Sequence, residues 1–272
     1  MDNKKTERSY IENFFERLLL NISIRLNEFL TYYKAFFKPP VNGKNNFIIF
    51  SSNRTGSTLL NMLLKSHSEI DCQGEIFLKF KESAFKKVLF PYLYIRGIKS
   101  ENHNTFGFVL KTQHIDVVFS DKHKDLVSNL YHKGWKIIYL KRLNIFRQAV
   151  SHLIAMTNKQ WHDFPEKPIK REKVYIDCKK LLPIINWFEK LAEIEEEILN
   201  NFKYKLVFYE NSLLEENNHQ KTCEDIFDFL GISAELVTTE IKKISTGSLE
   251  DQIINYEEVV NFFSKTKYSE FL

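Results

Sequence analysis

Residues 47–60 read FIIFSSNRTGSTLL, and this stretch decides the fold that the sequence predicts. Its first four residues are all apolar, which is typical of a central parallel strand covered on both faces. The next eight, 51–58, form a polar loop, and the apolar spacing after it predicts a helix. A strand, a polar loop and a helix in this order direct backbone N–H groups and the positive end of the helix dipole at an anion.

The residues of the polar loop offer several kinds of contact to an anion. Gly56 lets the backbone approach a ligand closely, and Ser57 and Thr58 add hydroxyl groups. Arg54 supplies a planar charged fork, and Thr55 lies between it and the glycine. A Walker loop has Lys directly before its Ser or Thr, but Gly56 holds that position here. We therefore predict a phosphate site without a metal ion, with a merely structural turn as the alternative.

Three further apolar runs, at 106–110, 135–140 and 206–209, alternate with helical patterns along the chain. This alternation predicts an α/β fold, a three-layer sandwich with a central parallel sheet between helices. Residues 157–180 carry prolines and charges but little periodicity, so we expect a long loop or lid there. The acidic run 195–197 is expected to be a solvated helix face.

The N-terminal region differs from the rest of the chain. Apolar residues recur with a helical period over 11–33 until Pro39 and Pro40 stop the pattern. We therefore divide the chain into a helix with its connector over 1–45 and one domain over 46–272. The apolar stripe of the helix is expected to pack on that domain, with a membrane surface or a partner as the alternative.

Composition limits the classes of function. The 272 residues include 39 Lys and Arg against 35 Asp and Glu, an excess too small for a dedicated nucleic-acid binder, so we expect a small anion as partner. Cys72, Cys178 and Cys223 are too few and too far apart for a disulfide framework or a metal cluster. No apolar stretch approaches the length of about 20 residues that spans a membrane. We expect a cytoplasmic protein.

Two runs resemble the sulfotransferases that use 3′-phosphoadenosine-5′-phosphosulfate. FIIFSSNRTGSTLL resembles their 5′-phosphosulfate loop, and residues 139–155, YLKRLNIFRQAVSHLIA, resemble their 3′-phosphate segment. The resemblance implies a P-loop NTPase-like fold, with the polar loop on the phosphosulfate and Arg142 and Ser151 on the 3′-phosphate. The family usually has its Arg eight residues before the Ser, where Leu143 stands here, and Arg147 is the alternative ligand.

Residues 71–77, DCQGEIF, resemble a stretch that ends in a Glu at the acceptor site of nodulation-factor-type and trehalose-type bacterial sulfotransferases. This resemblance implies that Glu75 is the general base, which takes the proton of the acceptor hydroxyl. Arg54 would stabilise charge on the transferred group. The alternative for Glu75 is a carboxylate in a surface turn.

Two further positions match the family at the acceptor side. His114, in GFVLKTQH, matches a frequent His, and strand alternation predicts that it faces the pocket while Lys111 points away. That family segment carries Lys directly after Gly-Phe, where this chain has Val109. Trp161 matches a lid Trp, and its ring can stack on a sugar.

These resemblances imply an enzyme that transfers a sulfuryl group from 3′-phosphoadenosine-5′-phosphosulfate to a hydroxyl group of a carbohydrate or glycolipid. The transfer would be an in-line displacement without a metal ion. A P-loop kinase that uses ATP, and a non-catalytic module that binds a nucleotide or a glycan, are the alternatives. No nucleic acid is expected as a partner, and the N-terminal helix is the expected place of any membrane contact.

Overall fold

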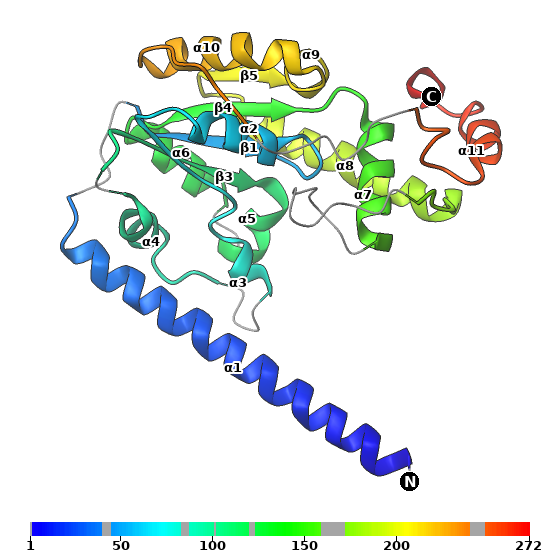
Figure 1. Cartoon of the computed structure of the whole chain (residues 1–272), viewed down its shortest axis with the longest axis horizontal. Coiled ribbons are helices and arrows are strands. Elements are labelled where there is room, and N and C mark those ends of the chain that lie inside the picture. Colours follow the sequence, from blue (N-terminus) through cyan, green and yellow to red (C-terminus); the bar gives the residue numbers. More distant parts are fainter. Residues whose placement is uncertain are drawn as a thin grey trace.

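A parallel β-sheet forms the centre of the molecule (Figure 1). The structure is a computed structural model that describes residues 2–39, 45–82, 87–100, 102–119, 123–158, 172–239 and 248–272. Within these residues the sheet has five strands in the order β2-β3-β1-β4-β5. They are β1 Phe47–Ser51, β2 Ile70–Gln73, β3 Thr105–Lys111, β4 Lys136–Lys141 and β5 Tyr204–Phe208. The predicted α/β fold with a central parallel sheet is confirmed.

Helices surround this sheet on both faces (Figure 1). In the described residues the α-helices are α1 Asp2–Phe36, α2 Ser57–Lys65, α3 Leu78–Glu82, α4 Pro91–Ile98, α5 Thr112–Phe119, α6 His123–His132, α7 Ile145–Asn158, α8 Cys178–Leu199, α9 Tyr209–Ser212, α10 His219–Leu230 and α11 Tyr256–Phe263. Two short 3₁₀ helices, Glu216–Asn218 and Ser269–Phe271, lie in the C-terminal part.

Alternate residues of β1 pack into two different hydrophobic clusters. Phe47 and Ile49 join the cluster that α2 and α10 complete, whereas Ile48 and Phe50 join the cluster that α4 and α6 complete. All four side chains are fully buried. Burial on both faces explains why the sequence of this strand is continuously apolar instead of alternating. A third cluster joins α7, α8 and α11 beside the sheet.

Some boundaries differ from the predicted ones. Strand β2 was not predicted, because it has only four residues and carries the polar Asp71 and Gln73. The last predicted strand begins earlier, at Tyr204, and Tyr209 already opens α9. In the predicted lid, α7 extends to Asn158 and α8 begins at Cys178. Residues 159–171 of that segment lie outside the described residues.

The prediction that the apolar stripe of α1 packs on the domain was wrong, because Leu19, Leu26 and Phe29 of that stripe are 57–65% exposed. A different face of the helix packs on the domain. Its Ile24, Glu28, Tyr32 and Ala35 are buried. The Glu28 carboxylate accepts the N–H of Leu89 at 3.0 Å, just before α4, and also accepts the hydroxyl of Tyr32. These contacts bind the helix to α4 through both apolar and polar groups. No helix in the described part of the chain is long and apolar enough to cross a membrane.

Gly97 of α4 sets the distance between α4 and α1. A Cβ atom at this position would lie only 2.0 Å from the carbonyl oxygen of Thr31, a backbone atom that cannot rotate away. We expect Gly97→Ala to force the two helices apart and to lower the free energy of unfolding by about 1–3 kcal/mol, the usual cost of overpacking. Urea unfolding measures this change.

Gly74→Ala is the matched control, because its Cβ would meet no atom within 4 Å. Equal stability of the two variants would contradict the close packing of α1 on α4.

Candidate active site

The polar loop, residues 51–58, leaves the carboxyl end of β1 in a conformation that ordinary residues avoid. Arg54 has a φ of 62° and Gly56 a φ of 87°. A Cβ atom on Gly56 would lie 2.7 Å from the Tyr209 ring, so glycine is required there both for its φ and for its small size. Arg54 has no such freedom, and the structure around it must hold its backbone in place.

Arg54 contacts both α7 and the residue that follows β4. Its Nε donates to the Oγ of Ser151 on α7 at 3.0 Å, and its carbonyl oxygen accepts a hydrogen bond from Nη1 of Arg142 at 3.0 Å. The two segments that the sequence singled out, the polar loop and the turn from β4 into α7, therefore meet at one place. They lie at the carboxyl edge of the sheet, where α/β proteins bind ligands.

Arg142 is enclosed by other side chains. Its guanidinium lies over the Tyr209 ring at 4.7 Å, and its Nε is 3.6 Å from the Glu210 carboxylate. Glu210 also accepts the N–H groups of Leu143 and Asn144 at 2.9 and 3.1 Å, at the start of α7. Tyr209 and Glu210 thus fix Arg142 next to the polar loop.

Burial makes these positive charges unfavourable in the absence of an anion. It lowers the pKa of the Arg54 guanidinium to about 10, together with the nearby charge of Arg142, which acts in the same direction. Burial also lowers the pKa of Arg142, although Tyr209 and Glu210 oppose the shift. Two buried guanidiniums that repel each other create a site where a bound anion relieves both desolvation and repulsion.

Lys111, at the end of β3, adds a third buried cation beneath the polar loop. Its Nζ donates to Oγ of Ser57 at 2.6 Å, to the carbonyl of Ser52 at 2.8 Å and to Oγ of Ser51 at 3.1 Å. Burial lowers its pKa to about 8. The prediction that Lys111 points away from the site was wrong, because β3 ends at this residue and the alternation of a strand does not continue into α5.

The remaining loop residues are held from inside the protein. Thr55 is buried and donates its hydroxyl to the carbonyl of Ser52 at 3.1 Å, while Ser57 and Thr58 open α2. Gln148 of α7 donates to Oγ of Ser52 at 3.0 Å and to the carbonyl of Asn53 at 2.7 Å. Sequence reasoning missed Gln148, although its place one helical turn before Ser151 was an available signal.

Glu75 and His114 form a second group near Lys111. The Glu75 carboxylate lies 3.6 Å from Nδ1 of His114, and the carboxylate side chain is 21% exposed. Burial lowers the pKa of His114 to about 3, and the charges of Lys81 and Lys111 act in the same direction. The imidazole is therefore neutral at pH 7, and the pair offers a solvent-accessible proton acceptor beside a neutral ring.

A buried carboxylate lies at the start of α5, the helix that carries His114. Glu195 of α8 accepts the hydroxyls of Thr112 and Tyr139 at 2.6 and 3.0 Å, and burial raises its pKa. The prediction of a solvated acidic face was wrong for this residue, because α8 turns Glu195 toward the sheet. Glu196 does lie on the exposed face, where it pairs with Lys141 at 2.6 Å.

An aromatic pair lies next to Ser151. His152 is buried, and its ring lies 5.5 Å from the ring of Trp187 on α8. Burial lowers the pKa of His152 to about 4, with Arg54 and Lys81 adding to the shift. Trp187 is 37% exposed. Sequence reasoning missed Trp187, because its spacing made it one of the apolar residues of a helical pattern. The predicted Trp161 lies outside the described residues.

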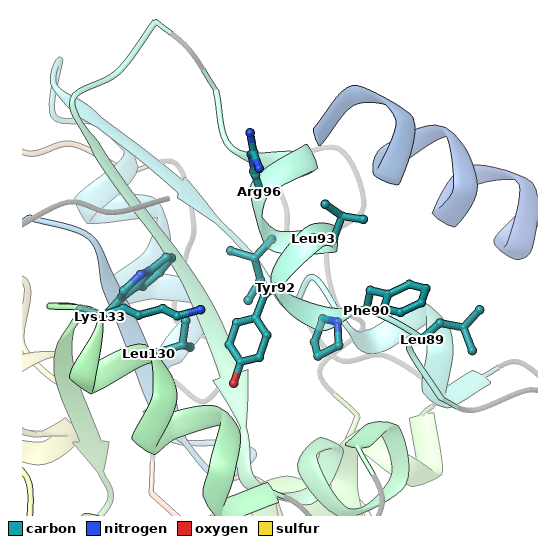
Figure 2. A pocket seen from close by; sticks show the side chains of 10 residues that line it. Leu89, Phe90, Tyr92, Leu93, Arg96, Leu130 and Lys133 are labelled. Carbon is teal, nitrogen blue, oxygen red and sulfur yellow. The ribbon is translucent and has the colours of Figure 1, made fainter. Parts of the chain in front are cut away.

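A separate pocket of about 440 Å³ lies elsewhere, against α4 (Figure 2). Its walls are mostly apolar, and Nζ of Lys133 lies 4.2 Å from the centre of the Tyr92 ring. Lys133 and Trp135 come just before β4, so this pocket lies toward the amino ends of the strands, whereas the polar loop follows a carboxyl end. It is therefore no part of the site around Arg54.

Comparison with known families agrees with this geometry. The family model described as "Sulfotransferase domain" matches residues 44–269. The chain belongs to the sulfotransferase family. Sulfuryl transfer is thus the activity of the family to which this chain belongs.

Solved structures and curated proteins add little to this assignment. The crystal structure of a sulfotransferase from Alicyclobacillus acidocaldarius is 14% identical in sequence, covers 80% of this chain and 91% of its own, and has a TM-score of 0.48. No curated protein matches the chain. Among the described residues no group of three or more His, Cys, Asp and Glu side chains could hold a metal ion.

The buried neutral His114 makes stability depend on pH. In the unfolded chain a histidine binds a proton near pH 6.5, but in the folded chain His114 does so only near pH 3. The unfolded state therefore gains protons first as the pH falls, and stability decreases below about pH 6.5. At about pH 5 we expect His114 alone to cost up to about 2 kcal/mol.

Urea unfolding at about pH 7.5 and about pH 5 tests this expectation. His114→Asn should lose less stability between the two pH values than the unmodified chain does. His132→Asn, at an exposed histidine, is the control and should leave the pH dependence unchanged. The same pH dependence in the His114 variant as in the unmodified chain would show that His114 is not held neutral.

Proposed function

We propose that this sulfotransferase transfers the sulfuryl group of 3′-phosphoadenosine-5′-phosphosulfate to a hydroxyl group of a carbohydrate or glycolipid. The observation that carries the proposal is the contact between Arg54 and Ser151, at 3.0 Å. This contact joins the two segments whose sequences resemble the two phosphate-binding elements of such enzymes. A bisphosphorylated nucleotide can reach both only if they are neighbours.

The donor would bind with its two ends on different elements. Residues 54–58 would hold the 5′-phosphosulfate through backbone N–H groups at the start of α2 and through Arg54. Ser151 and Arg142 would hold the 3′-phosphate. The buried positive charge of Arg54, Arg142 and Lys111 supports this assignment, because the donor carries negative charge at both ends.

The transfer itself needs a proton acceptor beside the sulfur atom. As the acceptor hydroxyl oxygen forms a bond to sulfur, its proton passes to Glu75, and the bond between sulfur and the 5′-phosphate oxygen breaks. Adenosine 3′,5′-bisphosphate leaves with the electron pair of that bond. Arg54 and Ser57 would stabilise the charge that develops on the sulfuryl and leaving oxygens. His114, neutral and 3.6 Å from Glu75, would orient the carboxylate or the acceptor.

A carbohydrate or glycolipid acceptor is supported by two observations. The stretch around Glu75 resembles the nodulation-factor-type bacterial enzymes, which sulfate carbohydrates. In the structure the partly exposed Trp187 lies beside His152, one residue from Ser151, and an indole ring offers a flat surface on which the apolar face of a sugar can stack.

Binding of the donor product tests the nucleotide assignment. Isothermal titration calorimetry should show that adenosine 3′,5′-bisphosphate binds more tightly than ATP. Arg142→Ala should weaken that binding by about 10- to 100-fold, because it removes a charged contact and releases the Arg54 backbone.

Arg147→Ala is the matched control. It removes the same charge from a residue five positions along the chain, and we expect less than about a threefold effect. Tighter binding of ATP would favour a kinase. A larger loss in the Arg147 variant than in the Arg142 variant would assign the 3′-phosphate to Arg147.

The role of Glu75 predicts a separation of turnover from donor binding. Glu75→Gln keeps the shape of the side chain but removes its basicity, so turnover should fall by about 10²–10⁴-fold. Affinity for adenosine 3′,5′-bisphosphate should stay unchanged in calorimetry. Transfer of labelled sulfate to a panel of glycans measures turnover.

Glu196→Gln, on the exposed face of α8, is the control and should keep full activity. Near-normal turnover in the Glu75 variant would remove this residue from the reaction. Donor binding with no transfer to any acceptor in the unmodified chain would instead indicate a binding module.

A further inference from the structure

Helix α1 carries a second apolar face that points away from the domain. Seven large apolar side chains on this face are 47–72% exposed, namely Phe15, Leu19, Ile22, Leu26, Phe29, Tyr33 and Phe36. Successive members are four and three residues apart in strict alternation. We call this set the α1 seam. The side chains that α1 buries against its own domain, such as Ile24, Glu28 and Ala35, lie on roughly the opposite face.

The spacing of the α1 seam is that of a coiled coil. Steps of four and three average 3.5 residues, and a helix with this repeat keeps its apolar line facing a partner helix along its whole length. The seam covers three such repeats. Leu18, Leu30 and Phe37 flank it and are also exposed, so a partner helix would cover them in part.

The exposed area is appropriate for a stable dimer. At roughly 100 Å² for each of the seven side chains, the seam presents about 700 Å² of apolar surface. A typical specific interface buries about 800 Å² on each partner. A single exposed patch of this size exceeds what most monomeric proteins carry and marks an interaction site.

The charges of α1 favour a second copy of the chain over a membrane surface. A helix that lies on a membrane usually carries Lys and Arg along its polar face. Helix α1 instead has six basic and five acidic residues, so it is almost neutral. Its N-terminal half also projects beyond the sheet and the other helices, where a second chain can reach it (Figure 1).

We propose that α1 is a dimerisation helix, and that the α1 seams of two copies pair in a coiled coil. A symmetric pair uses the same surface of both chains, which a self-complementary apolar seam provides. Leu26 is the middle member of the seam, so it meets Leu26 of the second copy whether the helices run parallel or antiparallel. None of the seam residues belongs to the Arg54 site, which lies on the domain.

Sedimentation velocity of the full chain at micromolar concentration tests the proposal. We expect a dimer for the unmodified protein and a monomer for Leu26→Glu, which places a charge in the middle of the seam. Asn27→Glu adds the same charge to the next residue, which is exposed but outside the seam, and should stay a dimer. Because position 26 is already exposed in the single chain, urea unfolding of the domain should change little in either variant.

Cross-linking gives a second measurement that does not depend on disrupting the helix. Leu26→Cys should form a disulfide between two chains under mild oxidation, whereas Asn27→Cys should not. The natural cysteines Cys72, Cys178 and Cys223 are buried and give a low background.

Three results would overturn the proposal. One is a monomeric unmodified chain, and another is a dimer that survives Leu26→Glu and gives no cross-link through Leu26→Cys. The third is a monomer that sediments with phosphatidylcholine and phosphatidylserine vesicles and loses this binding in Leu26→Glu. That last outcome would make α1 a membrane-surface helix.

Discussion

The site depends on positive charge that the fold buries at the carboxyl edge of its sheet. Arg54, Lys111 and Arg142 are all withdrawn from water, and burial lowers the pKa of each. Their placement is unfavourable by itself, and the packing of the sheet must compensate for it. The left-handed backbone of Arg54 belongs to the same arrangement, because Arg142 binds its carbonyl and Ser151 binds its side chain. Such strain, together with buried like charges, marks a place prepared for an anion.

The polar loop has no lysine of its own, and the order of the strands explains how Lys111 comes to lie beside it. Strands β1 and β3 are parallel neighbours, and their register sets Ser51 opposite Lys111. Nζ of Lys111, at the end of β3, therefore donates to the hydroxyls of Ser51 and Ser57. On the other side of β1, β4 leads into Arg142 and α7 in the same way. The loop thus receives its cations from the two strands next to it.

The features that could be predicted from the sequence are those that a local pattern of residues determines. The run 47–50 is apolar because both of its faces are covered, and that feature alone indicates a central strand. The direction of the Lys111 side chain could not be predicted from the sequence, since it depends on the residue at which β3 ends. The burial of Glu195 could not be predicted either, because it depends on how α8 is rotated against the sheet. The contact of Arg54 with Ser151 joins residues 97 positions apart, and only the resemblance to a family suggested it.

The orientation of α1 follows from a buried carboxylate and not from its apolar residues. An apolar helix free to rotate would turn its larger apolar face, with Phe29 and Leu26, toward the domain. Glu28 prevents this, because its carboxylate binds the N–H of Leu89 and the hydroxyl of Tyr32, and the Tyr32 hydroxyl in turn accepts the N–H of Phe90 at 3.0 Å. Rotation would leave these buried polar groups without their hydrogen-bond partners, which costs more than an ordinary hydrogen bond contributes. The polar contacts therefore hold the apolar seam outward, which is the arrangement an association helix requires.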